Sequence, residues 1–333
     1  MRLCLFTHTG RMRLGVELQG KILDLVLAYA FTMEGGISPV DRISVAGREL
    51  PPDPVAFLQA DDETRRLTQV VIEGALAREQ RLGADRTMFE NQSVLLDPKG
   101  LTFLPPVPQP RKVFGMARNY ALHAEEVDRT LKPGESMRAG RFFAFQKPPT
   151  CITGPYSPII IPPWVEKLDY ELELAVVVGR AGRHIPVARA YDHVGAYTII
   201  NNISDRSYLP AEGRVDWLGM KGQDTFGPLG PYLLIPEAGF DPHALSLSLK
   251  VNGEVRQSAS TAEMLFSIPQ IIAGISRLCT LEPGDIIATG SPAGNAAAFG
   301  AFLKDGDIIE GTIEQIGTQR NRITMQPAEY WRG

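Results

Sequence analysis

The sequence contains little cysteine. Its 333 residues include three cysteines, Cys4, Cys151 and Cys279, and none of them belongs to a Cys-x-x-Cys pair. An odd number of widely separated cysteines argues against a disulfide framework. We therefore expect reduced thiols that pack as small buried hydrophobic groups in a cytoplasmic protein.

Long apolar runs and an excess of positive charge are also missing. No apolar run approaches the roughly 20 residues that span a bilayer. The first residues become polar at Thr7 and His8, too early for the core of a signal peptide. The net charge of −4 provides no electrostatic footprint for nucleic acid. The sequence also lacks a P-loop and a repeat of fixed period. These absences indicate a soluble globular protein that binds neither membranes nor nucleic acid.

The proline-rich segment 104–110 divides the chain into two unequal parts. Prolines fix φ and remove backbone donors, so this segment is a natural connector. We predict a small N-terminal domain over residues 1–105 and a larger domain over 106–333.

In the N-terminal part, alternating apolar and polar residues predict short strands at 2–7, 13–18 and 21–27. A helix is predicted over 61–81, where one apolar stripe comprises Leu67, Val70, Val71, Ala75 and Leu76.

Two glutamates lie on a predicted strand in the larger part. The run from Lys167 to Gly179 alternates at period two, which places Glu171 and Glu173 on the same face. Two such carboxylates repel each other unless a cation or water separates them. The apolar residues that follow indicate a buried strand, so we interpret the pair as ligands of Mg²⁺, Mn²⁺ or Ca²⁺. The alternative is an exposed strand face that carries two solvated acids.

A histidine and a glutamate follow a short strand that begins near Lys112. His123 and Glu126 are three residues apart and become neighbours if this segment is helical. A carboxylate beside an imidazole orients the ring and raises its basicity, as a general base requires. The alternative is that His123 and Glu126 lie on an ordinary exposed helix surface without a catalytic role. The polar segment 127–141 could be a lid over this pair or a loop without function.

Further segments downstream combine strand ends with glycine-rich loops. The strand predicted over 195–208 ends in a cluster of small polar residues, and Lys221 begins a loop rich in glycine and proline. We also predict a hairpin over 245–255 around Asn252-Gly253 and an amphipathic helix over 267–278. A turn, a strand and a glycine loop follow over 281–294.

Six motifs follow one another along the larger part. They are Asn119-Tyr-x-x-His-x-x-Glu126, Asp169-Tyr-Glu-x-Glu173, Asn201-x-x-Ser-x-Arg206, Lys221-Gly-x-Asp-Thr-x-x-Pro-x-Gly-Pro231, Asn252-Gly253 and Leu281-x-Pro-Gly-Asp-x-Ile-x-Thr-Gly290. In this order they resemble the fumarylacetoacetate hydrolase family in its bacterial two-part form. The resemblance covers residues 110–325 strongly and 1–105 loosely. It implies an α+β, mostly β protein whose catalytic domain is a mixed β-sandwich roll around one divalent metal. It also implies a homodimer.

The resemblance assigns roles to individual residues. The metal ligands would be Glu171, Glu173 and Asn202, the catalytic residues His123, Glu126 and Lys221, and the substrate contacts Tyr120, Arg206 and Ser291. The chain departs from the family at Asn202, where the family has aspartate. An amide oxygen can coordinate a hard cation, but the charge of the ligand set falls from −3 to −2, so we expect weaker metal binding. Leu209 also replaces a family glutamine.

The resemblance implies an enzyme that acts on small 2-oxo or diketo acids with a bound Mg²⁺ or Mn²⁺. The leading hypothesis is hydrolysis of a carbon–carbon bond in an acylpyruvate-like diketo acid, with His123 activating water. The alternatives within the family are a 2-oxo acid decarboxylase, tautomerase or hydratase. A metal-poor relative without catalytic activity is the remaining alternative.

Overall fold

The computed structural model describes residues 1–33, 36–82, 88–89, 92–130, 141–208 and 215–326. The elements of the N-terminal part are β1 (Arg2–His8), β2 (Arg11–Leu18), β3 (Lys21–Asp24), α1 (Leu25–Thr32), α2 (Pro39–Glu49), α3 (Pro54–Leu58), α4 (Asp62–Leu82), β4 (Met88–Phe89), β5 (Gln92–Ser93), β6 (Leu95–Leu96) and β7 (Thr102–Leu104).

Two tight hairpins join the first three strands, as the alternating pattern predicts. Each has a two-residue turn, Thr9-Gly10 and Gln19-Gly20, and all four turn residues have positive φ. Turns of this kind match the right-handed twist of the strands that they connect.

The third predicted strand is wrong beyond Asp24, where α1 begins. The Asp24 side chain accepts a hydrogen bond of 3.0 Å from the Leu27 backbone N–H and so caps the helix. Most residues of α1 are buried and apolar, so the segment lacks the helical periodicity that would have revealed it. The helix predicted over 61–81 is confirmed as α4, although Val70 is 64% exposed and lies outside the buried stripe.

The remaining strands are β8 (Val113–Met116), β9 (Ala144–Lys147), β10 (Ile152–Thr153), β11 (Ile159–Ile161), β12 (Leu168–Asp169), β13 (Leu172–Val178), β14 (Val194–Asn201), β15 (Ser204–Asp205), β16 (Gly227–Pro228), β17 (Leu233–Leu234), β18 (Ser246–Val251), β19 (Glu254–Ser260), β20 (Ile286–Ala288), β21 (Ile308–Ile313) and β22 (Gly317–Met325). The helices are α5 (Ala121–Thr130), α6 (Trp217–Lys221), α7 (Ile268–Leu278) and α8 (Ala296–Phe299). The hairpin expected over 245–255 and the helix over 267–278 are confirmed.

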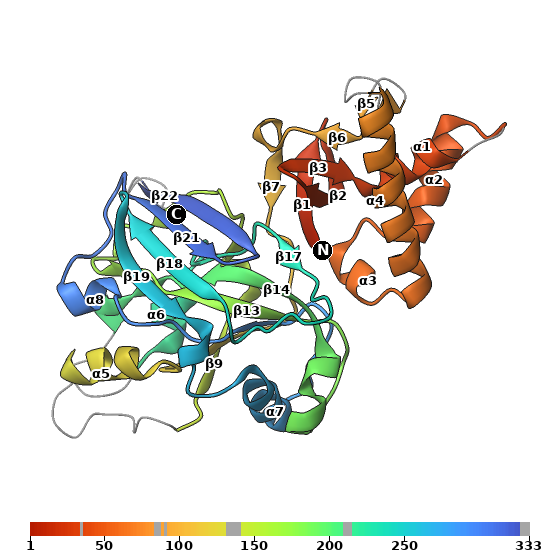
Figure 1. Cartoon of the computed structure of the whole chain (residues 1–333). Coiled ribbons are helices and arrows are strands. Elements are labelled where there is room, and N and C mark those ends of the chain that lie inside the picture. The colour runs from red at the N-terminus through yellow and green to blue at the C-terminus, as the bar shows by residue number, and fades with distance from the viewer. Residues whose placement is uncertain (34–35, 83–87, 90–91, 131–140, 209–214, 327–333) are drawn as a thin grey trace, which may run out of the picture.

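One large sheet crosses the position of the predicted domain boundary. Its strand order is β6-β3-β2-β1-β17-β14-β13-β20-β8-β9, with β7 paired to β1. Residues Arg2 and Leu3 of β1 pair with Leu234 and Leu233 of β17. Figure 1 shows the N-terminal elements in red to orange beside the rest of the chain, with β1 and β17 at the junction. The two parts are therefore joined by backbone hydrogen bonds as well as by the connector.

A second sheet, in the order β11-β22-β21-β18-β19, packs against the large sheet. Leu172 and Leu174 of β13 share a buried core with Leu247 of β18 and Ile309 of β21. The sheets approach closely where a Cβ on Gly311 would meet the Leu172 side chain at 2.5 Å. This strand-rich sandwich confirms the predicted α+β, mostly β fold class.

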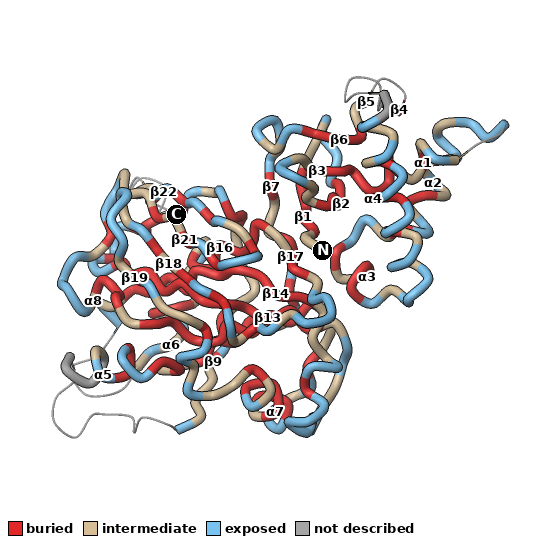
Figure 2. Tube along the Cα trace, viewed as in Figure 1, coloured by how far each residue is buried: buried red, intermediate tan, exposed pale blue. Residues whose placement is uncertain are grey.

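The central strand β13 is buried on both faces, which confirms the buried strand that the apolar residues after Glu173 predicted. All seven residues from Leu172 to Val178 are buried, and Figure 2 shows the buried trace continuing along β13 and β14. One face contributes to the core between the sheets and the other to the core shared with the N-terminal helices. Glu171 lies immediately before β13, and Glu173 lies within it.

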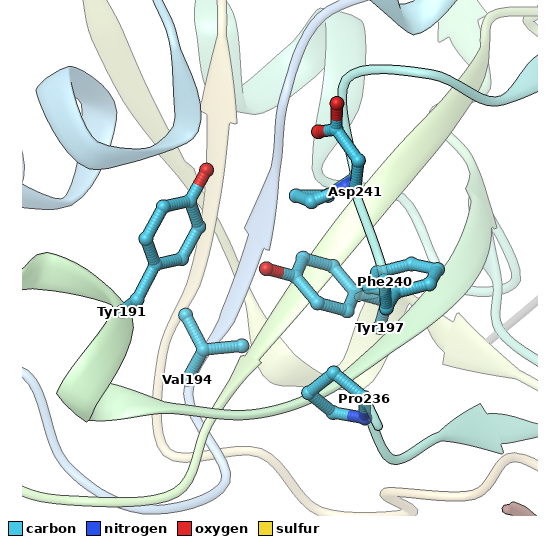
Figure 3. A pocket seen from close by; sticks show the side chains of 7 residues that line it. Tyr191, Val194, Tyr197, Pro236, Phe240 and Asp241 are labelled. Atoms are coloured by element: carbon cyan, nitrogen blue, oxygen red, sulfur yellow. The ribbon is translucent and has the colours of Figure 1, made fainter. Parts of the chain in front are cut away.

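A pocket of about 300 Å³ opens at the start of β14 (Figure 3). It is lined by Tyr191, Val194, Tyr197, Pro236, Phe240, Asp241 and Pro242. The predicted site residue Asn202 follows the other end of the same strand. The pocket and the predicted site are therefore separated by the length of β14.

Among the described residues, every helix is too short or too polar to span a bilayer.

Candidate active site

The antiparallel pairing of β13 with β14 brings the predicted metal ligands together. Leu172 pairs with Asn201, so the beginning of β13 lies beside the end of β14. The Asn202 backbone N–H donates to the Glu171 carbonyl at 2.7 Å. Glu171 is 6% exposed, and Glu173 and Asn202 are fully buried. Two carboxylates and one amide thus meet away from bulk water.

Glu171 is surrounded by cationic groups. Its carboxylate forms ion pairs with Arg206, at 2.5 Å, and with Lys221. Asn295 Nδ2 donates to it at 3.3 Å. Burial by itself would raise the pKa of Glu171, but Lys221 and Arg206 outweigh burial and hold the pKa at about 2. Glu171 is therefore ionised at neutral pH.

Glu173 has a different environment. It accepts hydrogen bonds from the Gly290 backbone N–H at 2.5 Å and from Asn202 Nδ2 at 2.8 Å. Within the described ranges it forms no ion pair. Burial, followed by the charge of Glu171, raises the pKa of Glu173 to about 7. A cation placed beside both glutamates would therefore stabilise the ionised form of Glu173.

Lys147 is a buried site residue for which the sequence suggested no role. It ends β9 and is 1% exposed. Its Nζ donates to Asn202 Oδ1 and to the Phe226 carbonyl, each at 2.8 Å. Burial lowers its pKa to about 8. The available signal was a lysine placed between an apolar strand and Pro148-Pro149, where a solvated side chain is not expected.

The predicted histidine and glutamate are neighbours on α5. His123 Nδ1 lies 3.7 Å from the Glu126 carboxylate, and His123 is 6% exposed. The Glu126 carboxylate accepts hydrogen bonds of 3.1–3.2 Å from the Gly294 backbone N–H. Among the described residues, His123 Nδ1 has no hydrogen-bond partner. A charged His123 is close enough to contribute to the low pKa of Glu171. The structure thus brings the pair to the acidic cluster.

Arg206 and Lys221 also reach the cluster, but both are already paired with protein groups. Arg206 Nε donates to Asp169 at 2.8 Å, in addition to its contact with Glu171. Lys221 donates to Glu171 and, at 3.0 Å, to the Asn202 carbonyl. Asp169 in turn accepts a hydrogen bond of 2.6 Å from the Ala296 N–H at the start of α8.

The two other predicted substrate contacts, Tyr120 and Ser291, lie in buried positions. Tyr120 is 1% exposed, burial raises the pKa of its hydroxyl, and that hydroxyl has no hydrogen-bond partner among the described residues. Ser291 accepts a hydrogen bond of 2.8 Å from Gln257. Sequence analysis missed Gln257 and Asn295, which support this side of the site. Leu209 and most of the predicted lid lie outside the described residues.

The donor set fits a hard divalent cation at two of the three predicted positions. Among the described residues, no group of three His, Cys, Asp or Glu side chains could hold a metal ion. The oxygens of Glu171 and Glu173 have the chemistry that Mg²⁺ and Mn²⁺ require. In contrast, Asn202 directs its oxygen to Lys147 and its nitrogen to Glu173.

Comparisons with known proteins support the resemblance. The family model described as fumarylacetoacetate (FAA) hydrolase C-terminal matches residues 112–324. The mitochondrial oxaloacetate tautomerase FAHD2A of Bos taurus is 37% identical over 260 residues, which cover 77% of this chain and 80% of that protein. The corresponding FAHD2B protein of Homo sapiens is 36% identical over 274 residues, covering 81% and 83%. An uncharacterized protein of Pyrococcus abyssi is 41% identical over 221 residues, covering 66% and 92%.

Solved structures match almost the whole chain. A fumarylacetoacetate hydrolase from Exiguobacterium antarcticum superposes with a TM-score of 0.70 and 30% identity, covering 98% of this chain and all of that one. Maleylpyruvate hydrolase from Sphingobium sp. SYK-6, in complex with manganese(II) and pyruvate, gives a TM-score of 0.69 and 27% identity with the same coverage. These matches include the N-terminal part, where the sequence resemblance was loose.

Proposed function

Because the chain belongs to the fumarylacetoacetate hydrolase family, we propose that it is an enzyme that interconverts the keto and enol forms of a small 2-oxo dicarboxylic acid of the oxaloacetate type. The observation that carries this proposal is the position of buried His123 and half-buried Glu126 beside an acidic cluster that is paired with three cationic side chains, two of them buried. The relatives named as oxaloacetate tautomerases are 36–37% identical over 77–81% of the chain.

Charge determines which substrate suits this site. Asp169, Glu171 and Glu173 contribute three carboxylates, and Lys147, Arg206 and Lys221 contribute three cationic groups. If all are ionised, these side chains sum to zero. Glu171 and Glu173 would hold a divalent cation, which supplies stabilisation for the negative charge that develops on an enolate oxygen. Glu126 adds one further carboxylate, so the loaded site would carry a net positive charge, which attracts an anionic oxo acid.

Tautomerisation requires a proton to move between carbon 3 and the 2-oxo oxygen. His123 would move it, because the ring is largely withdrawn from solvent and the Glu126 carboxylate lies 3.7 Å from its Nδ1. Lys221 would stabilise charge on the oxo oxygen through its ammonium group. Arg206 would attract a substrate carboxylate while remaining paired with Asp169 and Glu171.

A tautomerisation assay tests this proposal. The conversion of enol-oxaloacetate to the keto form is followed by the loss of enol absorbance, with Mg²⁺ or Mn²⁺ present. We expect acceleration by the wild type and a loss of about 10²–10⁴-fold in His123→Ala. His8→Ala, in strand β1, is the matched control and should retain full activity. Equal activity of His123→Ala and the wild type would contradict the assigned role, and no acceleration by any variant would contradict the proposed reaction.

Hydrolysis of a carbon–carbon bond in an acylpyruvate is the second candidate. The His123–Glu126 pair that would move a proton could also activate water, and a structural neighbour is named a maleylpyruvate hydrolase. Release of pyruvate from an acylpyruvate, without acceleration of oxaloacetate tautomerisation, would favour hydrolysis. Release of pyruvate from oxaloacetate would indicate decarboxylation.

A homodimer and a cytoplasmic location remain predictions, and sedimentation analysis would test the dimer.

A further inference from the structure

The amide group of Asn202 lies between a lysine and a glutamate in the interior of the site. Asn202 Oδ1 accepts a hydrogen bond of 2.8 Å from Lys147 Nζ, and Asn202 Nδ2 donates one of 2.8 Å to Glu173 Oε1. None of these three residues is more than 1% exposed. We call this arrangement the Lys147–Asn202 clamp.

The partners at both ends fix the orientation of the amide. Lys147 Nζ contacts two oxygens, Asn202 Oδ1 and the Phe226 carbonyl, and donates a hydrogen bond to each. Glu173 offers acceptor oxygens on the other side. If the amide were reversed, its NH₂ group would face the lysine and its oxygen would face a carboxylate. Because these three residues are almost inaccessible to solvent, each of these mismatches leaves polar groups unsatisfied.

We propose that Asn202 acts as a hydrogen-bond donor to Glu173 and is not a metal ligand, because Lys147 holds its oxygen away from the two glutamates. This inference rests on the metal-dependent function proposed above. Glu171 and Glu173 are then the two side chains that hold the cation, and Lys147 and Asn202 are positioning residues. The clamp limits the affinity for the metal, since it withdraws one oxygen and adds a donor to a carboxylate that must bind the cation.

An aspartate at this position would behave differently. A carboxylate has two equivalent oxygens, so one can accept a hydrogen bond from Lys147 while the other faces Glu173 and a cation. The added negative charge would also attract the metal. The clamp therefore depends on the amide itself, which presents an oxygen to only one side.

Calorimetric titration of the full-length protein with Mn²⁺, with and without oxalate, tests the assignment of Asn202. Asn202→Ala, which loses the donor to Glu173, should bind Mn²⁺ at least as tightly as the wild type, and Asn202→Asp should bind about tenfold more tightly. The melting temperature of each variant with saturating Mn²⁺ provides a second measure of affinity. A tenfold weakening in Asn202→Ala would show that the Asn202 oxygen coordinates the metal and would overturn the proposal.

A double-mutant cycle separates the clamp from the charge of Lys147. Lys147→Met removes a positive charge, which favours metal binding in any background, and it also releases the Asn202 amide. We expect Lys147→Met to tighten Mn²⁺ binding more in the Asn202 protein than in Asn202→Ala, which has no amide to release. Equal gains in the two backgrounds would show that Lys147 acts by charge alone and would overturn the clamp.

The outcomes distinguish this inference from the proposed function. If wild type and Asn202→Ala bind Mn²⁺ equally but tautomerisation is not accelerated, the clamp stands and the proposed reaction fails. If tautomerisation depends on Mn²⁺ and Asn202→Ala weakens its binding, the reaction stands and the clamp fails. Absence of Mn²⁺ binding in every variant, Asn202→Asp included, would overturn both.

Discussion

The protein buries charge in two regions, and the two regions treat it in opposite ways. In the N-terminal part, Asp24 caps α1 and lies 3.5 Å from Arg13, with both side chains almost inaccessible. Burial outweighs the Leu27 N–H and Arg13, so the pKa of Asp24 is raised. At the candidate site, Lys221 and Arg206 outweigh burial, and the pKa of Glu171 falls to about 2. Burial of a charge is therefore common to both regions and does not by itself indicate function.

The difference lies in how many segments each cluster draws together. The Arg13–Asp24 pair has a visible task, starting a helix, although Arg13 Nε and Asp24 Oδ2 have no hydrogen-bond partner among the described residues. The candidate site gathers three carboxylates and three cationic groups from separate segments. It still leaves Glu173 without an ion pair and His123 Nδ1 without a hydrogen-bond partner among the described residues. Unpaired carboxylate and imidazole groups at a place where many segments converge indicate ligand binding.

Among these substitutions, Glu171→Gln should cause the largest loss of activity and stability. The substitution leaves buried Lys221 and half-buried Arg206 beside a neutral amide and removes one of the two carboxylates proposed to hold the metal. We expect tautomerisation to fall by about 10³-fold and the free energy of unfolding to fall by about 3 kcal/mol. Enol absorbance and chemical denaturation measure the two effects.

Glu310→Gln is the matched control, since Glu310 forms an exposed pair with Arg320 at 3.3 Å. It should change neither activity nor, beyond about 0.5 kcal/mol, stability. Full activity in Glu171→Gln would mean that the buried ion pairs of Glu171 are as purely structural as those of Asp24.

Asp24→Ala should affect stability alone. It removes the cap of α1 and leaves Arg13 buried without its carboxylate, so we expect the free energy of unfolding to fall by about 3 kcal/mol. Asp53→Ala removes an exposed cap, whose Oδ1 accepts from the Ala56 N–H at 2.7 Å, and should cost only about 1 kcal/mol. Below the melting temperature, activity should remain within about twofold of the wild type. A large loss of activity in folded Asp24→Ala would break the distinction between the two regions.

Predictability from sequence also differs between these regions. The candidates His123, Glu171 and Glu173 were predicted because their chemistry is conspicuous at short spacing, and the structure brings them together, while their roles stay predictions. Lys147 was missed because its role depends on a contact with Asn202, 55 residues away in the sequence. Sequence spacing indicates which groups share a helix or strand face, but it does not reveal contacts between distant segments.

Prediction of the fold was likewise limited to local signals. Hairpins and amphipathic helices such as α4 and α7 were predicted, because turn residues and apolar periodicity are local signals. The first three residues of α1 were assigned to a strand, and the rest of the helix was not predicted, because most of its residues are buried and apolar. The pairing of β1 with β17, which joins the two parts of the chain, leaves no local signal at all.

Thiol labelling of the wild-type protein tests the burial of the two regions without any substitution. Cys4 lies in the N-terminal part and Cys151 near Lys147, and both are fully buried, whereas Cys279 is partly exposed. In the native protein, only Cys279 should react with iodoacetamide at a measurable rate. Burial raises the pKa of Cys279, so its thiolate fraction is below that of a free cysteine, and its rate should rise about tenfold per pH unit until the pH reaches that pKa.

The same two buried thiols show whether the two regions unfold together. Because β1 and β17 share one sheet, we expect Cys4 and Cys151 to become reactive at the same denaturant concentration, as mass spectrometry after pulsed alkylation would show. Asp24→Ala should then lower both midpoints equally. Reactivity of Cys4 at a lower concentration than Cys151 would mean that the N-terminal part opens alone. In that case the Arg13–Asp24 pair would stabilise only its own region, without contributing to the global stability of the candidate site.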